Sequence, residues 1–466
     1  MPSADVCLVL IYILVIVLVG NSLASVFARG GLLSRPFQRP LPSSLILYEV
    51  YLRGFCHQWA AFDIDYIHSL GCNAVWLTPI HPSPSSHGYD VTNYFNVHSD
   101  FGTLHEFYLL VQRFHARGMR VFIDMVLNHT SEKHPWFEKA LREPLLTDPF
   151  RQCFHFSATP PTSSPSMETA AWYQHKHDTQ SFWYRAAFGP QMPDWNLANR
   201  RVCRHHRQVA SFWLVEIGVD GFRMDAVKAL VYSLDQTPRL GSWQWLQKFY
   251  AWCRRLKPSV CILGELTMCS AVIATAQARG VMDLGFEFSL TEAIYASITT
   301  KSALPLVQML ALLGHLYPNR GASYVTFLSN HDQDRVASRV GRLEVALATV
   351  IWLSLPGAPC VYYGDEVGMQ GCCMDTDRRR PIWETKPTHN MSLCTLYKVM
   401  LEWRKGIRWE TFTWKASSSS RLLLSWTYAH FLVIDMKTRV LHSSKELHAI
   451  CKAYNICRAH ACSALE

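Results

Sequence analysis

The segment GFRMDAVK, residues 221–228, begins as an apolar run and ends in a polar cluster that contains Asp225. Four other segments have the same form: DMVLNH (124–129), MPDWN (192–196), ILGEL (262–266) and FLSNHD (327–332). This form is typical of a parallel strand that leaves a buried barrel and delivers side chains to its C-terminal rim. We therefore expect the chain to bring Asp225, Glu265 and Asp332 together.

The body of the chain alternates strand-like and helix-like segments, as βα units do. Eight strands are predicted, at residues 45–52, 74–77, 120–126, 218–225, 260–265, 282–287, 324–329 and 360–363. Helical patterns lie between them, for example at residues 63–70, 104–117, 208–217, 243–256 and 343–353. These elements predict an α/β protein with a (β/α)8 barrel, the TIM barrel, at residues 44–129 and 200–405.

Two regions depart from this alternation. Residues 130–199 are rich in aromatic, His and turn-forming residues. Because a structureless loop of this length is improbable in a compact domain, they are predicted to form a small inserted domain. Alternating runs at 421–428 and 431–436 predict a short C-terminal β domain at 406–466. No strand is predicted beyond residue 439, and the nature of that tail is open.

An uninterrupted apolar run, VCLVLIYILVIVLV, occupies residues 6–19. It is short for a membrane span of about 20 residues and suits the core of a secretory signal peptide. No Lys or Arg precedes the run, whereas Arg29, Arg35 and Arg39 follow it, which keeps an uncleaved anchor as the alternative. Residues 1–28 are therefore expected to be a signal peptide or membrane anchor, and the protein to be secreted or membrane-anchored.

Composition limits the classes of partner. The chain has 466 residues, 49% of them hydrophobic, which is enough for a large core. The formal net charge of +9 is spread along the chain, so no nucleic-acid partner is expected. The fifteen cysteines lack regular spacing, and Cys72 and Cys261 lie in apolar stretches typical of core residues. No C-x-x-C pair with a matching His pair occurs, so no zinc site is predicted.

Three carboxylates on three separate strand ends suit glycoside hydrolysis. In that reaction one carboxylate attacks the anomeric carbon and one carboxyl group protonates the leaving oxygen. Any single Asp or Glu here could equally be a strand-end cap or a surface ion pair. The ordered set of five polar strand ends favours the catalytic interpretation.

The five segments resemble the five short sequence regions of the α-amylase family of retaining glycoside hydrolases, and the resemblance covers about residues 44–383. It implies that Asp225 is the nucleophile, Glu265 the general acid/base and Asp332 the transition-state stabiliser. Arg223 corresponds to the family's arginine that orients the nucleophile and keeps it ionised. Two residues apart on a strand, Arg223 and Asp225 face the same side. The insert corresponds to the family's domain B.

The resemblance also implies a set of substrate-binding residues. His129 and His331 match two imidazoles that hydrogen-bond sugar hydroxyls around the cleaved bond. Tyr89 and Asp90 match a tyrosine that stacks on the sugar and its companion. Lys228 matches a lysine on the leaving-group side.

Three further residues have two possible roles each. Asp375 and Arg379 resemble a pair that holds the next glucose unit, although a charged surface loop would look the same. Asn128 matches a position that ligates a structural Ca²⁺ in many α-amylases, and oxygen ligands suit that ion. A strand-end asparagine that only makes hydrogen bonds is the alternative there. No other cofactor is expected.

We expect an enzyme that cleaves α-1,4-glucosidic bonds in starch or malto-oligosaccharides. Ala226 favours this linkage, since members that prefer α-1,6 bonds tend to carry Val there. An α-glucosidase, an oligo-1,6-glucosidase or a transglycosylase is the alternative, because MPDWN lies between the forms of amylases and oligo-1,6-glucosidases. A non-catalytic amino-acid transporter heavy-chain-like protein is the alternative of another class. The complete catalytic set and the lack of a Cys soon after the apolar run argue against it.

Overall fold

The computed structural model describes residues 45–142, 147–159, 172–177, 180–234, 240–318, 324–341, 344–427, 430–438 and 440–443. The segment expected to be a signal peptide or membrane anchor lies outside these residues, as does the tail from residue 444. Among the described helices, none is both long and apolar enough to cross a membrane.

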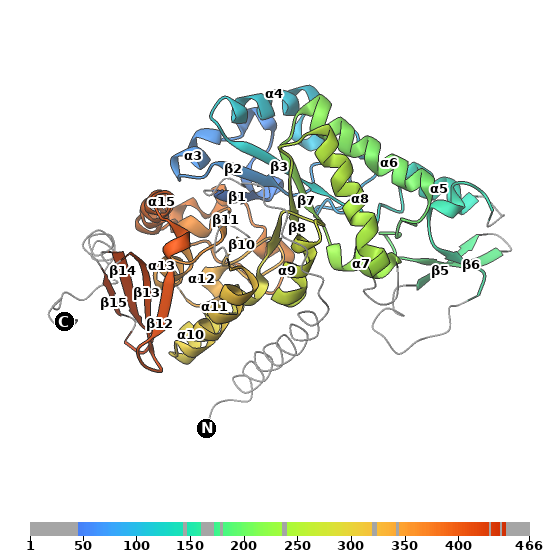
Figure 1. The fold of residues 1–466 in the computed structure, drawn as a ribbon. Helices are drawn as coiled ribbons and strands as arrows, with labels where there is room; N and C mark the ends of the chain where they lie inside the picture. Colours follow the sequence, from blue (N-terminus) through green and yellow to red (C-terminus); the bar gives the residue numbers. More distant parts are fainter. Residues whose placement is uncertain are drawn as a thin grey trace.

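Eight parallel strands close into a barrel at the centre of the molecule (Figure 1). Their order around the barrel is β1-β11-β10-β9-β8-β7-β3-β2, so strands that follow one another in the barrel sequence are also neighbours in space. The strands are β1 Leu47–Val50, β2 Ala74–Leu77, β3 Arg120–Met125, β7 Gly221–Met224, β8 Cys261–Gly264, β9 Leu284–Phe286, β10 Tyr324–Thr326 and β11 Ala358–Tyr362. The predicted TIM barrel is confirmed.

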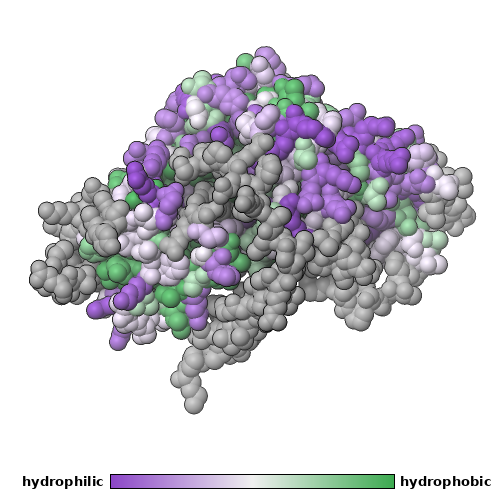
Figure 2. Space-filling view, in the orientation of Figure 1, coloured by the Kyte–Doolittle hydropathy of each residue, from purple (hydrophilic) through white to green (hydrophobic). Residues whose placement is uncertain are grey.

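Helices cover the outside of the barrel and carry the chain back to its N-terminal end (Figure 1). The covering helices are α3 Ile64–Ser69, α4 Leu104–His115, α6 Arg200–Ser211, α7 Val227–Leu234, α8 Leu240–Leu256, α9 Ser270–Ala278, α10 Phe288–Thr300, α11 Leu304–Leu316, α13 Val345–Leu353 and α15 Met391–Lys405. The four-residue helices α2 Leu52–Phe55, α12 Val336–Arg339 and α14 Asp375–Arg378 belong to the connections that follow β1, β10 and β11. A π-helical turn at Phe212–Ile217 extends α6. Figure 2 shows hydrophilic side chains over the outer face of α6, while Val202 and Val209 of the same helix are buried.

Two apolar layers stabilise the barrel. Inside it, large side chains such as Trp76, Phe122 and Phe327 pack against one another. Between the strands and the helices lies a second and larger cluster, which includes Trp213 and Trp352. Each fully buried side chain of this size contributes roughly 1.5–3 kcal/mol. The polar residues at the strand ends therefore stand on a rigid support.

Predicted and observed strands share their positions but differ at their ends. The fourth predicted strand ran through Asp225, whereas β7 ends at Met224. The polar residues that follow a strand no longer pair with the neighbouring strands, and they form the loops at the rim of the barrel. A pattern of apolar residues does not show where this pairing ends. The last strand starts at Ala358, two residues before the predicted start, because Pro359 still pairs in parallel with Thr326.

The insert between β3 and β7 contains α5 (Pro135–Arg142) and an antiparallel sheet in the order β4-β6-β5. Its strands are β4 Phe156–Ser157, β5 Trp172–His177 and β6 Gln180–Arg185. The insert lies at one side of the barrel, to the right in Figure 1. An antiparallel insertion after the third barrel strand is therefore present, as expected.

The C-terminal unit is an antiparallel sheet of β12 (Thr413–Ala416), β13 (Arg421–Thr427), β14 (His430–Asp435) and β15 (Val440–Ser443). The segment after residue 439, where the sequence pattern indicated no strand and left the tail open, begins with β15, which pairs with β14 from Leu432↔Ser443 to Asp435↔Val440. A strand of this length carries too few residues to show alternation. It forms because β14 offers a free edge.

The described cysteines form no disulfide bond. Cys72 is 2% exposed and Cys261 is 1% exposed, so their prediction as core residues is confirmed.

Candidate active site

Arg223, in β7, joins the carboxylates at the strand ends. Its Nη1 donates to Asp225 and to Asp124, both at 2.6 Å. Its Nη2 lies 2.9 Å from Oε2 of Glu265. Because both nitrogens belong to one planar guanidinium, Asp225 and Glu265 face the same cation. The guanidinium is almost fully buried, which strengthens these interactions.

Glu265 receives a second hydrogen bond from the turn after β7. The backbone N–H of Ala226 donates to its Oε2 at 2.9 Å. Ala226 has a φ of 48°, in the left-handed region that costs a residue with a Cβ about 1–2 kcal/mol. The chain therefore accepts a strained residue at the position that directs this amide toward Glu265.

Two cationic side chains hold Asp332, whose own side chain is half exposed. Nε2 of His331 lies 3.1 Å from its Oδ2, and Nη2 of Arg379 donates to its Oδ1 at 2.8 Å. His331 in turn lies 2.7 Å from Glu49 through Nδ1 and 2.7 Å from the Tyr89 hydroxyl through Nε2. This hydroxyl also accepts from Arg223 at 3.3 Å, so the two parts of the site form one network.

The charges of this network follow from its contacts. Burial opposes the charged form of His331, but Asp332 and Glu49 outweigh it and raise the pKa of the imidazole to about 10. Burial likewise opposes ionisation of Asp332, and His331 together with Arg379 holds the pKa of Asp332 well below its usual range. At neutral pH Asp332 is therefore an anion beside two cations.

Glu265 and Asp225 differ in their surroundings. Burial raises the pKa of Glu265, and the negative charges of Asp225 and Asp332 raise it further, while Arg223 opposes the shift. Burial also raises the pKa of Asp225, but its direct bond to Arg223 favours the anion. The arrangement suits a protonated Glu265 beside an ionised Asp225.

Sequence reasoning missed Glu49 and Asp124. Glu49 lies within β1 and is 1% exposed, and it also accepts from the backbone N–H of His331 at 3.1 Å. Asp124, at the end of β3, accepts from the indole of Trp76 at 2.9 Å. Burial raises its pKa to about 7 while Arg223 opposes the shift. A charged residue inside an otherwise apolar strand is the signal that could have identified both.

The other predicted residues lie at the edges of the network. Arg379 pairs with Asp375 at 3.4 Å, so this predicted pair is in contact. Asp90 is buried and accepts from the hydroxyls of Ser83 and Ser85. Through these two hydroxyls it supports the loop ahead of Tyr89.

His129 follows β3 and Lys228 follows β7. Burial lowers the pKa of His129 to about 4, so its imidazole is neutral at pH 7. The exposed ring of Phe188, from the insert, lies 5.0 Å from that imidazole. Lys228 is exposed at the start of α7.

The surroundings of Asn128 do not fit the calcium ion that the resemblance implied. Ca²⁺ requires six to eight oxygen ligands. The Asn128 side chain instead donates its amide nitrogen to Asp194 at 3.0 Å, and Asp194 is paired with Arg185 at 3.2 Å. Among the described residues no group of three His, Cys, Asp or Glu side chains could hold a metal ion.

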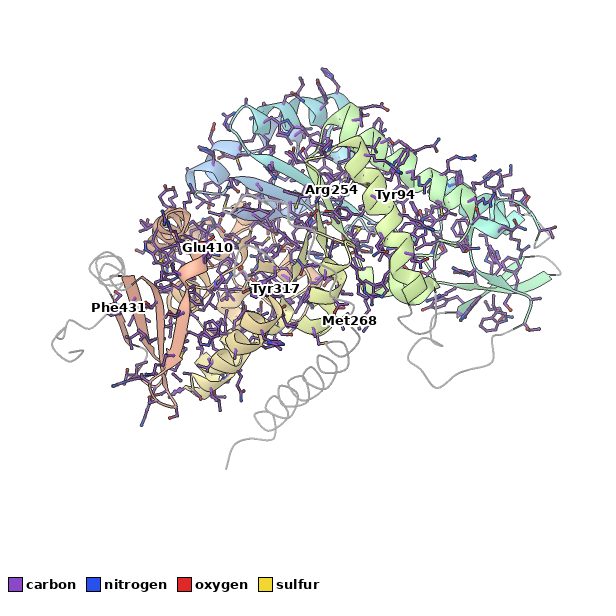
Figure 3. The ribbon with its side chains drawn as sticks, in the orientation of Figure 1. Tyr94, Arg254, Met268, Tyr317, Glu410 and Phe431 are labelled. Carbon is purple, nitrogen blue, oxygen red and sulfur yellow. The ribbon has the colours of Figure 1, made fainter. Side chains whose placement is uncertain are left out.

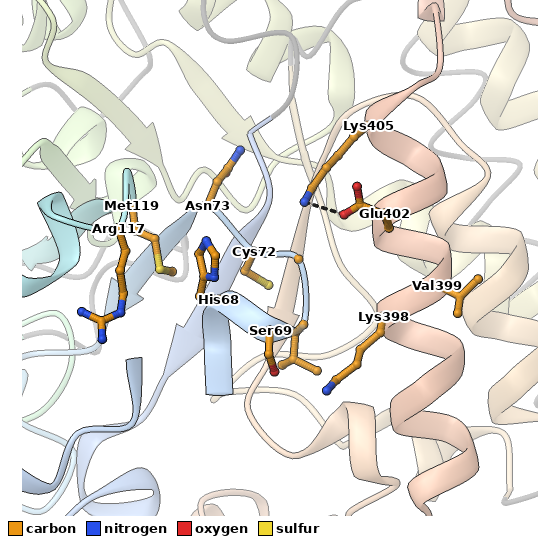
Figure 4. Close-up of a pocket in the computed structure, with 12 residues that line it drawn as sticks. His68, Ser69, Cys72, Asn73, Arg117, Met119, Lys398, Val399, Glu402 and Lys405 are labelled. Carbon is orange, nitrogen blue, oxygen red and sulfur yellow. Dashed lines mark hydrogen bonds and ion pairs between the residues drawn. The ribbon is translucent and has the colours of Figure 1, made fainter. Parts of the chain in front are cut away.

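A surface pocket lies at the opposite end of the barrel (Figure 4). It is lined by residues that precede β2, such as Cys72 and Asn73, and by Lys398 and Lys405 of α15. Figure 4 shows Lys405 in an ion pair with Glu402, at 2.7 Å. The catalytic network occupies the C-terminal ends of the strands, so this pocket takes no part in it.

Comparisons with known proteins agree with this geometry. The model of the α-amylase catalytic domain family matches residues 61–452. "Alpha-amylase 3" of Dictyoglomus thermophilum is 33% identical over 358 residues, which are 74% of this chain and 68% of that protein. A 4-alpha-glucanotransferase of Thermotoga neapolitana is 31% identical over 351 residues, 70% of this chain and 72% of that enzyme.

Solved structures show the same likeness. The α-amylase of H. orenii superimposes with a TM-score of 0.72 at 26% identity, over 85% of this chain and 90% of that one. The barrel, the insert after β3 and the carboxylates at the strand ends define a glycoside hydrolase that acts on α-glucans. The chain belongs to the α-amylase family.

Proposed function

We propose that this enzyme is a retaining hydrolase of α-1,4-glucosidic bonds in starch or malto-oligosaccharides. The observation that carries the proposal is the contact of Arg223 with both Asp225 and Glu265. A retaining mechanism needs two carboxyl groups about 5–5.5 Å apart, so that one of them can attack the sugar directly. One guanidinium that binds both groups favours this close spacing over the wider one of inverting enzymes.

In the proposed mechanism Asp225 attacks the anomeric carbon while Glu265 protonates the departing oxygen. Arg223 keeps Asp225 ionised and orients it. Burial and the neighbouring negative charges raise the pKa of Glu265, which favours its protonated form, while Arg223 and the Ala226 N–H oppose the shift. After the leaving sugar departs, Glu265 removes a proton from water, and this water releases the sugar from Asp225.

Asp332 supports the charged transition state in this proposal. The anomeric carbon gains positive charge as the glycosidic bond breaks. Asp332 remains an anion between His331 and Arg379, and its side chain is half exposed. Its charge is therefore available when positive charge develops, while its two partners fix its position.

The linkage that the enzyme cleaves and the molecule that accepts the glycosyl group are also part of the proposal. The small side chain of Ala226, beside Glu265, leaves space for the leaving sugar of an α-1,4 bond. The similarity to a glucanotransferase supports transfer of the glycosyl group to a second sugar as the other candidate reaction. Both reactions share the glycosyl-enzyme step and differ only in whether water or a sugar accepts the glycosyl group.

One assay separates these possibilities. Purified protein is incubated with maltose, isomaltose, trehalose, sucrose, maltoheptaose and starch, and the products are chromatographed. We expect shorter malto-oligosaccharides from maltoheptaose and starch. Products longer than the substrate would show transglycosylation, and faster cleavage of isomaltose than of maltose would contradict the proposed linkage.

The apolar run at residues 6–19 supports export of this enzyme through the secretory pathway. Fractionation of expressing cells and culture medium would test this proposal.

A further inference from the structure

The insert returns to the barrel along the segment that contains Asp194. The backbone N–H of Trp195 donates to the carbonyl of Asn128 at 2.9 Å. His129 and Asp194 form an antiparallel bridge beside this bond. The imidazole that resembles a substrate-binding group thus stands on the junction between insert and barrel.

The carboxylate of Asp194 is the charged centre of this junction, and it is fully buried. The Asn128 amide donates to its Oδ1 at 3.0 Å and the backbone N–H of Ala187 donates to the same oxygen at 3.1 Å. The remaining oxygen, Oδ2, accepts no hydrogen bond, and its charge is met by the ion pair with Nε of Arg185, the last residue of β6, at 3.2 Å. A buried carboxylate without a cationic partner would be strongly destabilising.

A calcium ion and Arg185 compete for the same place. An ion bound to Oδ2 at 2.3–2.6 Å would face the guanidinium, and the two positive charges would repel each other. Asn128 offers Asp194 its nitrogen rather than its oxygen, which is the orientation for a hydrogen bond within the protein. The charge that balances Asp194 therefore comes from the chain.

We infer that Arg185 takes the place of a structural cation at the junction between insert and barrel. It acts as a positioning residue, because it holds Asp194, and Asp194 holds the segment that carries His129. The junction accordingly keeps its shape without calcium. The inference itself does not depend on the reaction, but its kinetic test rests on the proposed function.

The first test compares thermal unfolding of the full chain with EDTA and with millimolar Ca²⁺. We expect the same unfolding midpoint in both, because Arg185 already occupies the site. A midpoint that rises with Ca²⁺ in the natural protein and no longer rises in Asp194→Asn would overturn the inference.

The second test removes the cation. Arg185→Ala leaves Asp194 buried and unpaired, and we expect its unfolding midpoint to fall by about 5 °C or more. Arg142→Ala is the matched control, since the Arg142 side chain is 75% exposed in the same insert and pairs with Glu138 at only 4.0 Å. An Arg185→Ala midpoint equal to that of Arg142→Ala would contradict the inference.

A double variant keeps the test decisive if Arg185→Ala does not fold. Arg185→Met with Asp194→Asn removes both charges and preserves most of the side-chain volume. We expect this pair to be more stable than Arg185→Met alone, because no buried charge is left unpaired. Equal or lower stability of the double variant would show that the ion pair is not what holds the junction.

Kinetic measurements then distinguish a role of Arg185 in positioning His129 from a role in fold stability alone. Below the midpoint of each variant, we expect Arg185→Ala to raise KM for maltoheptaose several-fold, because His129 loses its support. A lower kcat at unchanged KM would indicate a loss of folded enzyme and would contradict the positioning role. If the natural protein cleaves none of the sugars, the proposed function fails, while the two unfolding tests still decide the role of Arg185.

Discussion

Four buried imidazoles, one of which is that of His206, lie near the ring of Tyr94, which is labelled in Figure 3. His81, His134 and His205 lie 5.8, 6.0 and 5.5 Å from it, measured between ring centroids. Burial lowers the pKa of His81 to about 4, that of His134 to about 3 and that of His205 to about 4. These side chains are therefore neutral where unfolded histidines, with a pKa of about 6.5, are already charged.

The sign of the effect on stability follows directly. Between pH 6.5 and about 4 the unfolded chain binds a proton at His205 and the folded chain does not, so the free energy of unfolding falls as the pH falls. For a pKa of about 4 against about 6.5, the loss between pH 7 and pH 5 is about 2 kcal/mol. Buried Asp124 and Asp365, each with a pKa raised to about 7 by burial, respond in the opposite direction.

The assay isolates His205 by comparison with His205→Phe, whose flat ring fits the aromatic surroundings but cannot be protonated. Urea unfolding is followed by tryptophan fluorescence at pH 7 and pH 5. We expect the natural protein to lose about 2 kcal/mol more than the variant over this interval. His68→Gln, at an exposed position, is the control and should behave as the natural protein does. An identical pH dependence in His205→Phe and the natural protein would refute the reasoning.

The remaining predictions concern the catalytic network. Asp225→Asn should abolish turnover while the unfolding midpoint stays near that of the natural protein, and a folded but fully active variant would exclude Asp225 as nucleophile. Glu265→Gln should nearly eliminate cleavage of malto-oligosaccharides yet spare activated aryl glucosides in part, and equal loss on both would remove Glu265 from the acid role. Glu49→Gln should lower kcat/KM by about tenfold, roughly 1.4 kcal/mol, because His331 loses a charged partner; an unchanged value would show that Glu49 has no positioning role. Ala226→Val should raise the ratio of isomaltose to maltose cleavage, and it should also lower stability because a β-branched side chain is more strained than alanine at positive φ; an unchanged ratio would contradict the linkage argument.

The sequence was sufficient to predict the barrel and the residues at the ends of its strands. Each of Arg223, Asp225 and Glu265 follows a short apolar run, and parallel strands in a closed barrel deliver their ends to one rim. Local pattern and general topology together therefore placed these side chains in one network. Their catalytic roles came from the resemblance and stay predictions.

Partners far apart along the chain were not predictable in this way. Glu49 meets His331 across 282 residues, and its strand LYEV offers no sign of that partner. The pairing of Arg185 with Asp194 depends on how β6 lies against the returning segment of the insert. β15 was missed because its stability comes from pairing with β14 rather than from its own pattern.

The central claim is that Asp225 attacks the sugar, and trapping of the glycosyl-enzyme tests it most directly. The protein is incubated with a fluorinated α-glucosyl fluoride whose glycosyl-enzyme hydrolyses slowly, digested with trypsin and examined by mass spectrometry. Cleavage after Arg223 and Lys228 releases the peptide MDAVK. The proposed mechanism predicts a sugar adduct on Asp225 in this peptide, and an adduct on any other residue would contradict it.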